Sequence, residues 1–191
     1  MNEIIMLWKP ILASAALVFM ASSIIWMFLP IHKSDYKNPG AKEGPLLDAL
    51  RDAALPGGTY HLPWCDHKNM KDPAVMAKSK AGPWALMHVF PKQPNMGPMM
   101  GVWFLNLVLI GVFVAYLAGN AGLTGDNAAY LNVFRVTGTA AMLAYGGSSL
   151  TMCIWHGHAW SLLPGKLFDA VVYGLLTAGC FAWLWPRAVG A

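Results

Sequence analysis

The sequence predicts an all-α membrane protein with four transmembrane helices and a small extramembrane α+β insertion between the first and second helices. Hydrophobic residues make up 57% of the 191 residues and charged residues only 12%, about half of the ~25% usual in a soluble domain. Four long stretches contain no Asp, Glu, Lys or Arg: 10–32, 93–125, 136–165 and 170–186. Each can supply the ~17 to 25 apolar residues that a helix needs to cross a ~30 Å hydrocarbon layer.

The first crossing is expected at about 11–29, within an anchor segment 1–31. The apolar run from Ile11 to Leu29 is longer than the ~7 to 15 residues of a signal-peptide core, and no small-residue cleavage pattern follows it. Trp8 and Trp26 stand near its ends, where indoles favour the headgroup boundary. We therefore expect a retained anchor helix.

Residues 32–98 form the predicted extramembrane segment. They hold nine of the 13 prolines and 15 of the 22 charged residues. A short helix is expected around 46–54, and a second over 74–81, where Asp72 and Pro73 provide an N-cap and a proline at the first helical position. The stretches 59–62 and 84–90, bounded by Gly and Pro, are expected to pair as a two-stranded ribbon. A segment of this size barely supports a core, so we expect it to lean on the bundle.

The remaining crossings lie in the segment 99–191. We expect them at about 100–118, 130–149 (with a possible continuation to 155) and 168–185. Glycine, Asn and Asp residues in 119–127 indicate a short turn, so the second and third helices should be antiparallel neighbours.

Small residues recur at helical spacing in three of the four predicted crossings. Since helices in lipid gain nothing from burying apolar side chains against each other, close packing relies on small residues. These stripes serve either contacts inside one bundle or contacts with another protein. The candidate packing residues are Gly111, Ala115, Gly119, Gly138, Ala170, Gly174 and Ala178.

Basic residues beside the predicted helix ends favour a cytoplasmic long loop with both termini outside. The loop face holds six, against three on the other face. The six are Lys33, Lys37, Lys42, Lys80, Lys92 and Lys166, and the three are Lys9, Arg135 and Arg187. This placement also explains the net charge of +4 without a nucleic-acid partner.

Two ionisable residues near the predicted crossings are interpreted as structural. Arg135 lies close enough to the start of its helix for its stem to reach the surface. Asp169 opens the fourth helix, where the helix dipole favours a carboxylate and Lys166 lies three residues back. No histidine is expected at the middle of a crossing, which argues against a haem held deep between helices.

A metal ion is the alternative chemistry that the sequence offers, although no cofactor is predicted outright. Histidine and cysteine gather in two groups on the predicted loop face, with Asp66 inside the first. Neither group has the paired spacing usual for zinc. A copper variant adds Met96, Met99 and Met100, because thioethers suit Cu(I). The candidate ligands are His61, Cys65, His67, Cys153, His156 and His158.

Enzyme signatures are absent from the sequence: there is no nucleotide loop, no zinc-protease motif and no nucleophile elbow. We therefore expect a non-enzymatic integral membrane protein, an accessory, structural or assembly subunit of a larger membrane complex. Its partners would be the lipid bilayer and other membrane subunits or further copies of itself. A metal-handling protein and a small permease are the alternatives.

Several segments together resemble a family of small, uncharacterised bacterial inner-membrane proteins with four helices. The resemblance rests on 31–36 (IHKSDY), 114–119 (VAYLAG), 133–141 (VFRVTGTAA), and 176–179 (LTAG) with 183–186 (WLWP). It implies a bacterial inner-membrane setting and, since no activity is known for that family, no site.

Overall fold

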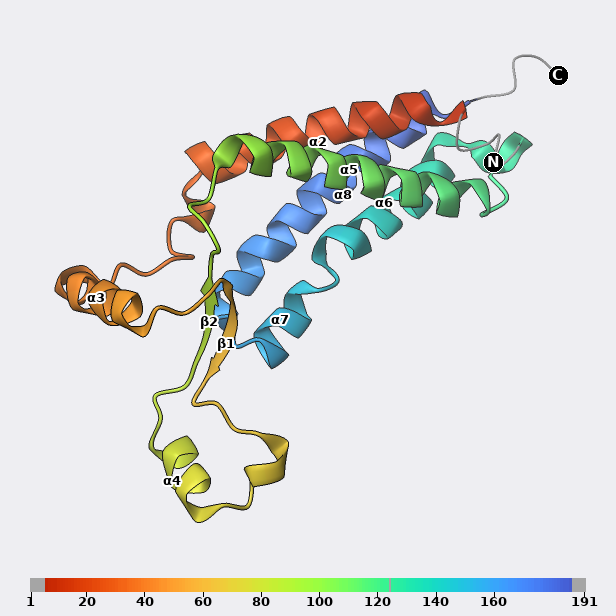
Figure 1. Ribbon diagram of the computed structural model, residues 1–191. Helices are drawn as coiled ribbons and strands as arrows, with labels where there is room; N and C mark the ends of the chain where they lie inside the picture. Colours follow the sequence, from red (N-terminus) through yellow and green to blue (C-terminus); the bar gives the residue numbers. More distant parts are fainter. Residues whose placement is uncertain (1–5, 124, 187–191) are drawn as a thin grey trace. The chain divides into compact units, whose positions relative to one another are not determined.

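The computed structural model describes residues 6–123 and 125–186, and the chain divides into two compact units. The helix bundle consists of the residues up to Asp35 and those from Met96 onward, and the insertion unit runs from Tyr36 to Asn95. Figure 1 shows that most of the chain is helical. The helical fold class with a small α+β insertion is therefore confirmed.

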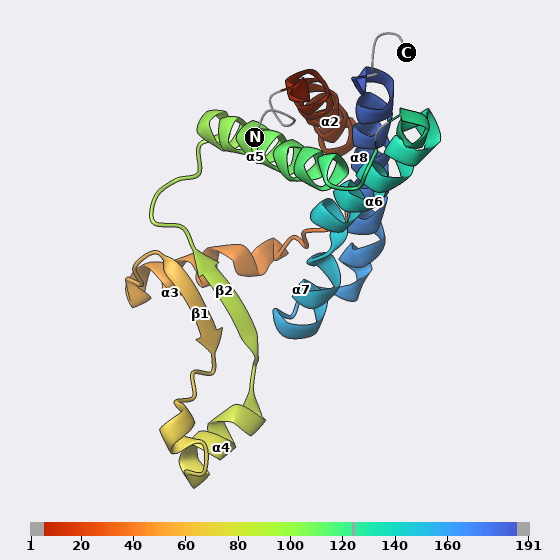
Figure 2. The same ribbon diagram turned by 90° about the vertical axis from the view of Figure 1, so that its right-hand side faces the viewer.

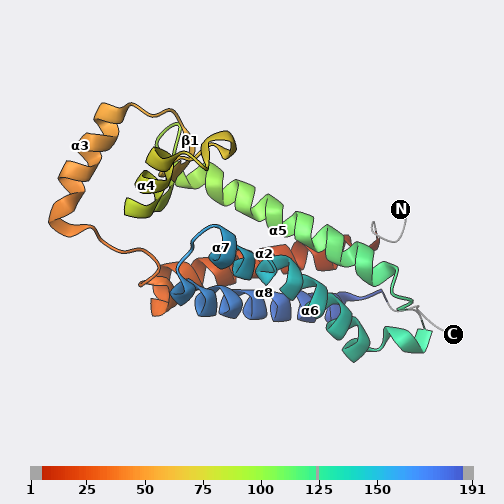
Figure 3. The same ribbon diagram turned by 90° about the horizontal axis from the view of Figure 1, so that it is seen from below.

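Four helices build the bundle: α2 (Trp8–Phe28), α5 (Met96–Gly119), α6 (Tyr130–Gly146) and α8 (Leu163–Leu184). Each packs against two others in the ring order α2, α5, α6, α8, an arrangement visible in Figure 2. A short helix, α7 (Ser149–Trp155), follows α6, and the turns η4 (Gly125–Ala128) and η5 (Trp160–Leu162) precede α6 and α8. Figure 3 shows α6 and α7 alongside α8.

Three helices have the length and apolarity needed to cross a membrane: Trp8–Phe28, Met96–Gly119 and Trp160–Leu184, the last including η5. The sequence predicted four crossings, the third of them at about 130–149 with a continuation to 155 as an option. That segment consists of the 17-residue α6 and the 7-residue α7. Among the described residues, three helices rather than four are therefore long and apolar enough to span a membrane.

The break between α6 and α7 follows from two adjacent glycines. Gly146 and Gly147 both have low helix propensity, about 1 kcal/mol below alanine each. The backbone N–H of Gly147 donates to the carbonyl of Leu143 at 2.8 Å, and a Cβ at Gly147 would lie 2.5 Å from that oxygen. The tight turn therefore excludes a side chain at this position, and the helix restarts at Ser149.

The bundle core has two parts along its length. One part contains Val18, Ile25, Leu107 and Tyr173. The other part contains Ile11, Val114 and Phe181, the last of which is fully buried.

The insertion unit contains an antiparallel ribbon of β1 (Gly58–Leu62) and β2 (Ala85–Val89), with Gly58 opposite Val89 and Leu62 opposite Ala85. This confirms the predicted ribbon. Helix α3 (Glu43–Ala53) precedes β1, and α4 (Pro73–Ala81) lies between the strands in sequence. Two short turns, η2 (Gly40–Lys42) and η3 (His67–Asn69), complete the unit, while η1 (Pro30–His32) belongs to the bundle.

Candidate functional site

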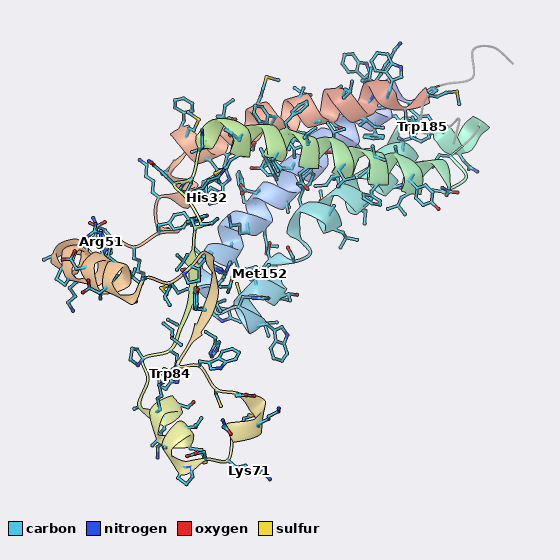
Figure 4. All side chains as sticks on the ribbon, in the orientation of Figure 1. His32, Arg51, Lys71, Trp84, Met152 and Trp185 are labelled. Carbon is cyan, nitrogen blue, oxygen red and sulfur yellow. The ribbon has the colours of Figure 1, made fainter. Side chains whose placement is uncertain are left out.

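The chain turns back on itself directly after α2 and brings a carboxylate to a histidine. Leu29 is extended and Pro30 opens the turn η1. The N–H of Lys33 donates to the carbonyl of Pro30, and the N–H of Asp35 donates to the carbonyl of His32. This tight turn places the Asp35 carboxylate beside the His32 ring, which Figure 4 shows just beyond the end of α2.

His32 lies between two carboxylates. Its Nδ1 is 2.8 Å from Oδ2 of Asp35, and its Nε2 is 3.2 Å from Oδ1 of Asp169, the residue that sits in the second turn of α8. All three side chains are more than nine-tenths buried, with exposed fractions of 3% for His32, 7% for Asp35 and 9% for Asp169. We call these three residues the Asp–His–Asp cluster.

Trp26 of α2 completes the surroundings of the cluster. Its indole N–H donates to Oδ2 of Asp169 at 3.3 Å, and its ring stacks on the His32 imidazole with centroids 4.0 Å apart and planes 5° apart. The ammonium group of Lys166 lies 4.2 Å from the Trp26 ring centroid, a cation–π distance. Gly165 leaves room for the histidine, since a Cβ there would lie 3.1 Å from Cε1 of His32.

A strip of buried polar side chains continues from Asp169 along α8. Tyr173 and Thr177 follow at four-residue intervals and are 4% and 1% exposed. Among the described residues, neither the Tyr173 hydroxyl nor the Thr177 hydroxyl makes a hydrogen bond of standard geometry, and their polar neighbours are Trp26 for Tyr173 and Tyr145 for Thr177. Tyr145 of α6 packs edge-on against Tyr173, with ring centroids 5.5 Å apart. The strip is therefore polar surface enclosed between helices.

The small residues of α8 lie against α6. A Cβ at Gly138 would lie 3.1 Å from that of Ala178, and one at Gly146 would lie 2.8 Å from that of Ala170. At Gly174 a Cβ would overlap the side chain of Met142. The two helices are therefore antiparallel and in close contact along this stripe.

On α5, Gly111 lies against Ile11 of α2, where a Cβ would come within 3.1 Å of the isoleucine side chain. Ala115 is fully buried, and Gly119 is the half-buried last residue of α5. The sequence predicted that these residues pack against another helix, without saying which one. In the structure, the neighbour of Gly111 is α2.

The two groups of candidate metal ligands belong to different units. In the bundle, Cys153 of α7 is buried, whereas His156 and His158 are exposed. In the insertion, the ring of His61 donates from Nδ1 to the carbonyl of Pro63 at 3.3 Å, and Cys65 is half-buried. The side chain of His67 lies outside what the structure describes. Among the described residues, no three His, Cys, Asp or Glu side chains are grouped to hold a metal ion.

The methionines of the copper hypothesis begin α5. Met96 and Met99 are 71% and 51% exposed, and Met100 is half-buried.

Of the two ionisable residues interpreted as structural, Arg135 is exposed on α6, whereas Asp169 is the shared acceptor of His32 and Trp26. Lys166 contacts Trp26 rather than forming an ion pair with Asp169.

Sequence reasoning missed the Asp–His–Asp cluster because its central pair joins residues 137 positions apart. One local signal was present: His32 and Asp35 have i,i+3 spacing directly after an apolar helix. A second was the position of Asp169 at the mouth of an otherwise uncharged span, which marks a functional candidate by default.

Comparisons of the chain with protein-family models, with curated proteins and with solved structures found no match.

Proposed function

We propose that this chain is a non-enzymatic integral membrane protein that acts as an accessory, structural or assembly subunit of a larger bacterial membrane complex. Three apolar helices provide the membrane anchor. The broken helix α6–α7 completes a fourth passage, because α6 runs antiparallel to α8 over the contacts from Ala178 to Ala170. The partners are the lipid bilayer and either other membrane subunits or further copies of the chain.

The observation that carries the proposal is the surface of the insertion unit. Every described side chain between Tyr36 and Asn95 is exposed or only half-buried, so neither helix and neither strand of the unit has a core. Large apolar side chains left outside a core are available for contact with another protein or a membrane. Within the insertion unit, the large aromatic side chains with exposed fractions of 65–82% are Tyr36, Trp64, Trp84 and Phe90.

Tryptophan and tyrosine are also the residue types enriched at protein interfaces, where they supply much of the binding free energy. Figure 4 shows Trp84 at the junction between β2 and α4. Its indole N–H donates to the carbonyl of Ser79 at 2.7 Å, which fixes the ring while leaving 68% of the side chain exposed. A rigid, exposed aromatic side chain of this kind is suited to a partner contact.

The proposed setting is the bacterial inner membrane with the insertion on the cytoplasmic side. The six lysines that precede, follow or lie within the predicted loop segments support this orientation. Cys65 is half-buried in the insertion, and Cys153 and Cys180 are buried in the bundle. A membrane-impermeant maleimide should therefore label the chain only after the inner membrane is opened. Labelling in intact spheroplasts would contradict the cytoplasmic orientation.

The subunit role is tested by extracting the protein from native membranes into polymer nanodiscs and measuring particle mass. We expect a discrete assembly heavier than the 20.7 kDa chain. A Trp64→Ala, Trp84→Ala variant should shift the mass to that of the single chain, while Phe113→Ala, on the outer face of α5, should not. A wild-type chain that is always alone in its particle contradicts the proposal.

A further inference from the structure

The contacts of the His32 ring fix a minimum number of protons. Both ring nitrogens lie at hydrogen-bond distance from a carboxylate oxygen. An ionised carboxylate can only accept a hydrogen bond, and a neutral imidazole carries one N–H. Two such contacts need two protons, so the Asp–His–Asp cluster holds one proton more than a neutral imidazole with two ionised carboxylates.

The charges that face the cluster favour holding this extra proton. Asp35 and Asp169 contribute two negative charges, and Lys166, beside Trp26, contributes one positive charge. With an imidazolium at His32, the net charge of the two aspartates, the lysine and the histidine is zero. From the other helices, α5 carries no charged residue, and α6 contributes the Tyr145 phenol, which contacts Tyr173.

The strip on α8 extends this site inward. Successive positions at four-residue intervals lie about 6 Å apart along a helix, so Tyr173 and Thr177 continue from Asp169 toward the middle of the bundle. Their hydroxyl groups are buried and, among the described residues, make no hydrogen bond of standard geometry, although Trp26 and Tyr145 lie beside them. A buried hydroxyl of this kind is normally satisfied by an internal water. A hydroxyl both donates and accepts, which is the property that a proton path requires.

The strip ends at an apolar seal. Four residues after Thr177, α8 carries Phe181. This side chain is fully buried in the core cluster that also contains Leu7, Ile11 and Val114. Chains of Asp, His and hydroxyl side chains inside membrane bundles are the groups from which proton relays are built. The buried hydroxyls of Ser14 and Thr137, in the other part of the bundle, donate instead to backbone carbonyls of their own helices.

We propose that the Asp–His–Asp cluster is a proton-uptake site, and that it passes protons to Tyr173 and Thr177 along a half-channel closed by Phe181. This gives the bundle an activity of its own, beyond the proposed subunit role. In the elementary step a proton leaves Oδ2 of Asp35 and bonds to Nδ1 of His32. The proton on Nε2 then moves to Oδ1 of Asp169, and the imidazole returns to neutral with its tautomer exchanged. No electron moves.

The protonation state of His32 is the first test. Histidine labelled with ¹⁵N is observed in nanodiscs, and the His32 signal is assigned by its loss in His32→Gln. We expect both ring nitrogens of His32 to show a hydrogen-bonded proton, held either by the ring or by the carboxylate that faces it. Asp169→Asn should change the signal of Nε2, and the exposed control Asp48→Asn should not. A wild-type His32 ring with a hydrogen-bonded proton at only one nitrogen overturns the proposal.

Opening the seal is the second test. In proteoliposomes carrying a pH gradient, Phe181→Ser should raise proton flux at least tenfold over the wild type, with Phe181→Ala as a milder opening if the serine variant does not fold. Adding His32→Gln or Tyr173→Phe should return the flux to the wild-type level. Absence of flux in both folded Phe181 variants, or flux unaffected by His32→Gln, overturns the half-channel.

Discussion

The bundle and the insertion unit hold their ion pairs in opposite surroundings. In the bundle, His32 and Asp169 are at least nine-tenths buried and lie between α2 and α8. In the insertion, Arg51 and Asp48 approach to 2.6 Å on one helix, yet their side chains are 68% and 71% exposed. The shorter contact is the weaker one, because water screens it and already solvates both groups. Burial rather than distance decides what a pair contributes to stability.

The largest expected effect is the loss of one partner in the buried cluster. Asp169→Ala leaves Nε2 of His32 and the Trp26 indole without their acceptor, and removing one member of a buried pair typically costs about 3 to 5 kcal/mol. Equilibrium unfolding in mixed micelles should show this decrease in the free energy of unfolding. Asp48→Ala is the exposed control, and equal decreases for the two variants would contradict the comparison.

A smaller effect is expected where α6 meets α8. Gly174→Ala places a methyl group against Met142, and such overpacking costs about 1 to 3 kcal/mol. Gly179→Ala on the same helix is the matched control, since a Cβ there meets no atom within 4 Å and alanine favours a helix by about 1 kcal/mol over glycine. The same unfolding assay should therefore give opposite signs for the two substitutions.

The N-cap of α4 should matter less and only locally. Oδ1 of Asp72 accepts a hydrogen bond from the N–H of Ala74 at 2.7 Å, and its loss in Asp72→Ala should cost about 0.5 to 2 kcal/mol. Hydrogen exchange of the α4 amides should become faster while exchange in α2 and α8 stays unchanged. The neighbouring variant Lys71→Ala should leave α4 exchange as in the wild type.

The smallest effect is expected at the exposed pair. Arg51→Ala should change the stability of α3 by no more than about 0.5 kcal/mol, the range for exposed i,i+3 and i,i+4 pairs. Hydrogen exchange of the α3 amides provides the measurement. If Arg51→Ala lowered stability as much as Asp169→Ala does, the Arg51–Asp48 pair would have to be shielded from water.

The sequence predicted the insertion better than the interior of the bundle, for a physical reason. The start of α4 at Asp72–Pro73 and the ribbon bounded by Gly and Pro depend on neighbouring residues, so their patterns are visible locally. The His32–Asp169 contact joins the two ends of the chain, and no local pattern contains it. The break at Gly147 lies between these cases: two adjacent glycines were visible, but their effect depends on the contact with Leu143.

We propose that the insertion packs against a partner surface, whereas the bundle forms its own core. Hydrogen exchange of the purified chain in nanodiscs, compared with the chain in native membranes, tests this most directly. We expect strong protection of α2 and α8 in both preparations, and protection of α3, α4 and the ribbon that rises only in native membranes. An insertion protected as strongly as the bundle in the purified chain, with no further change in native membranes, would contradict it.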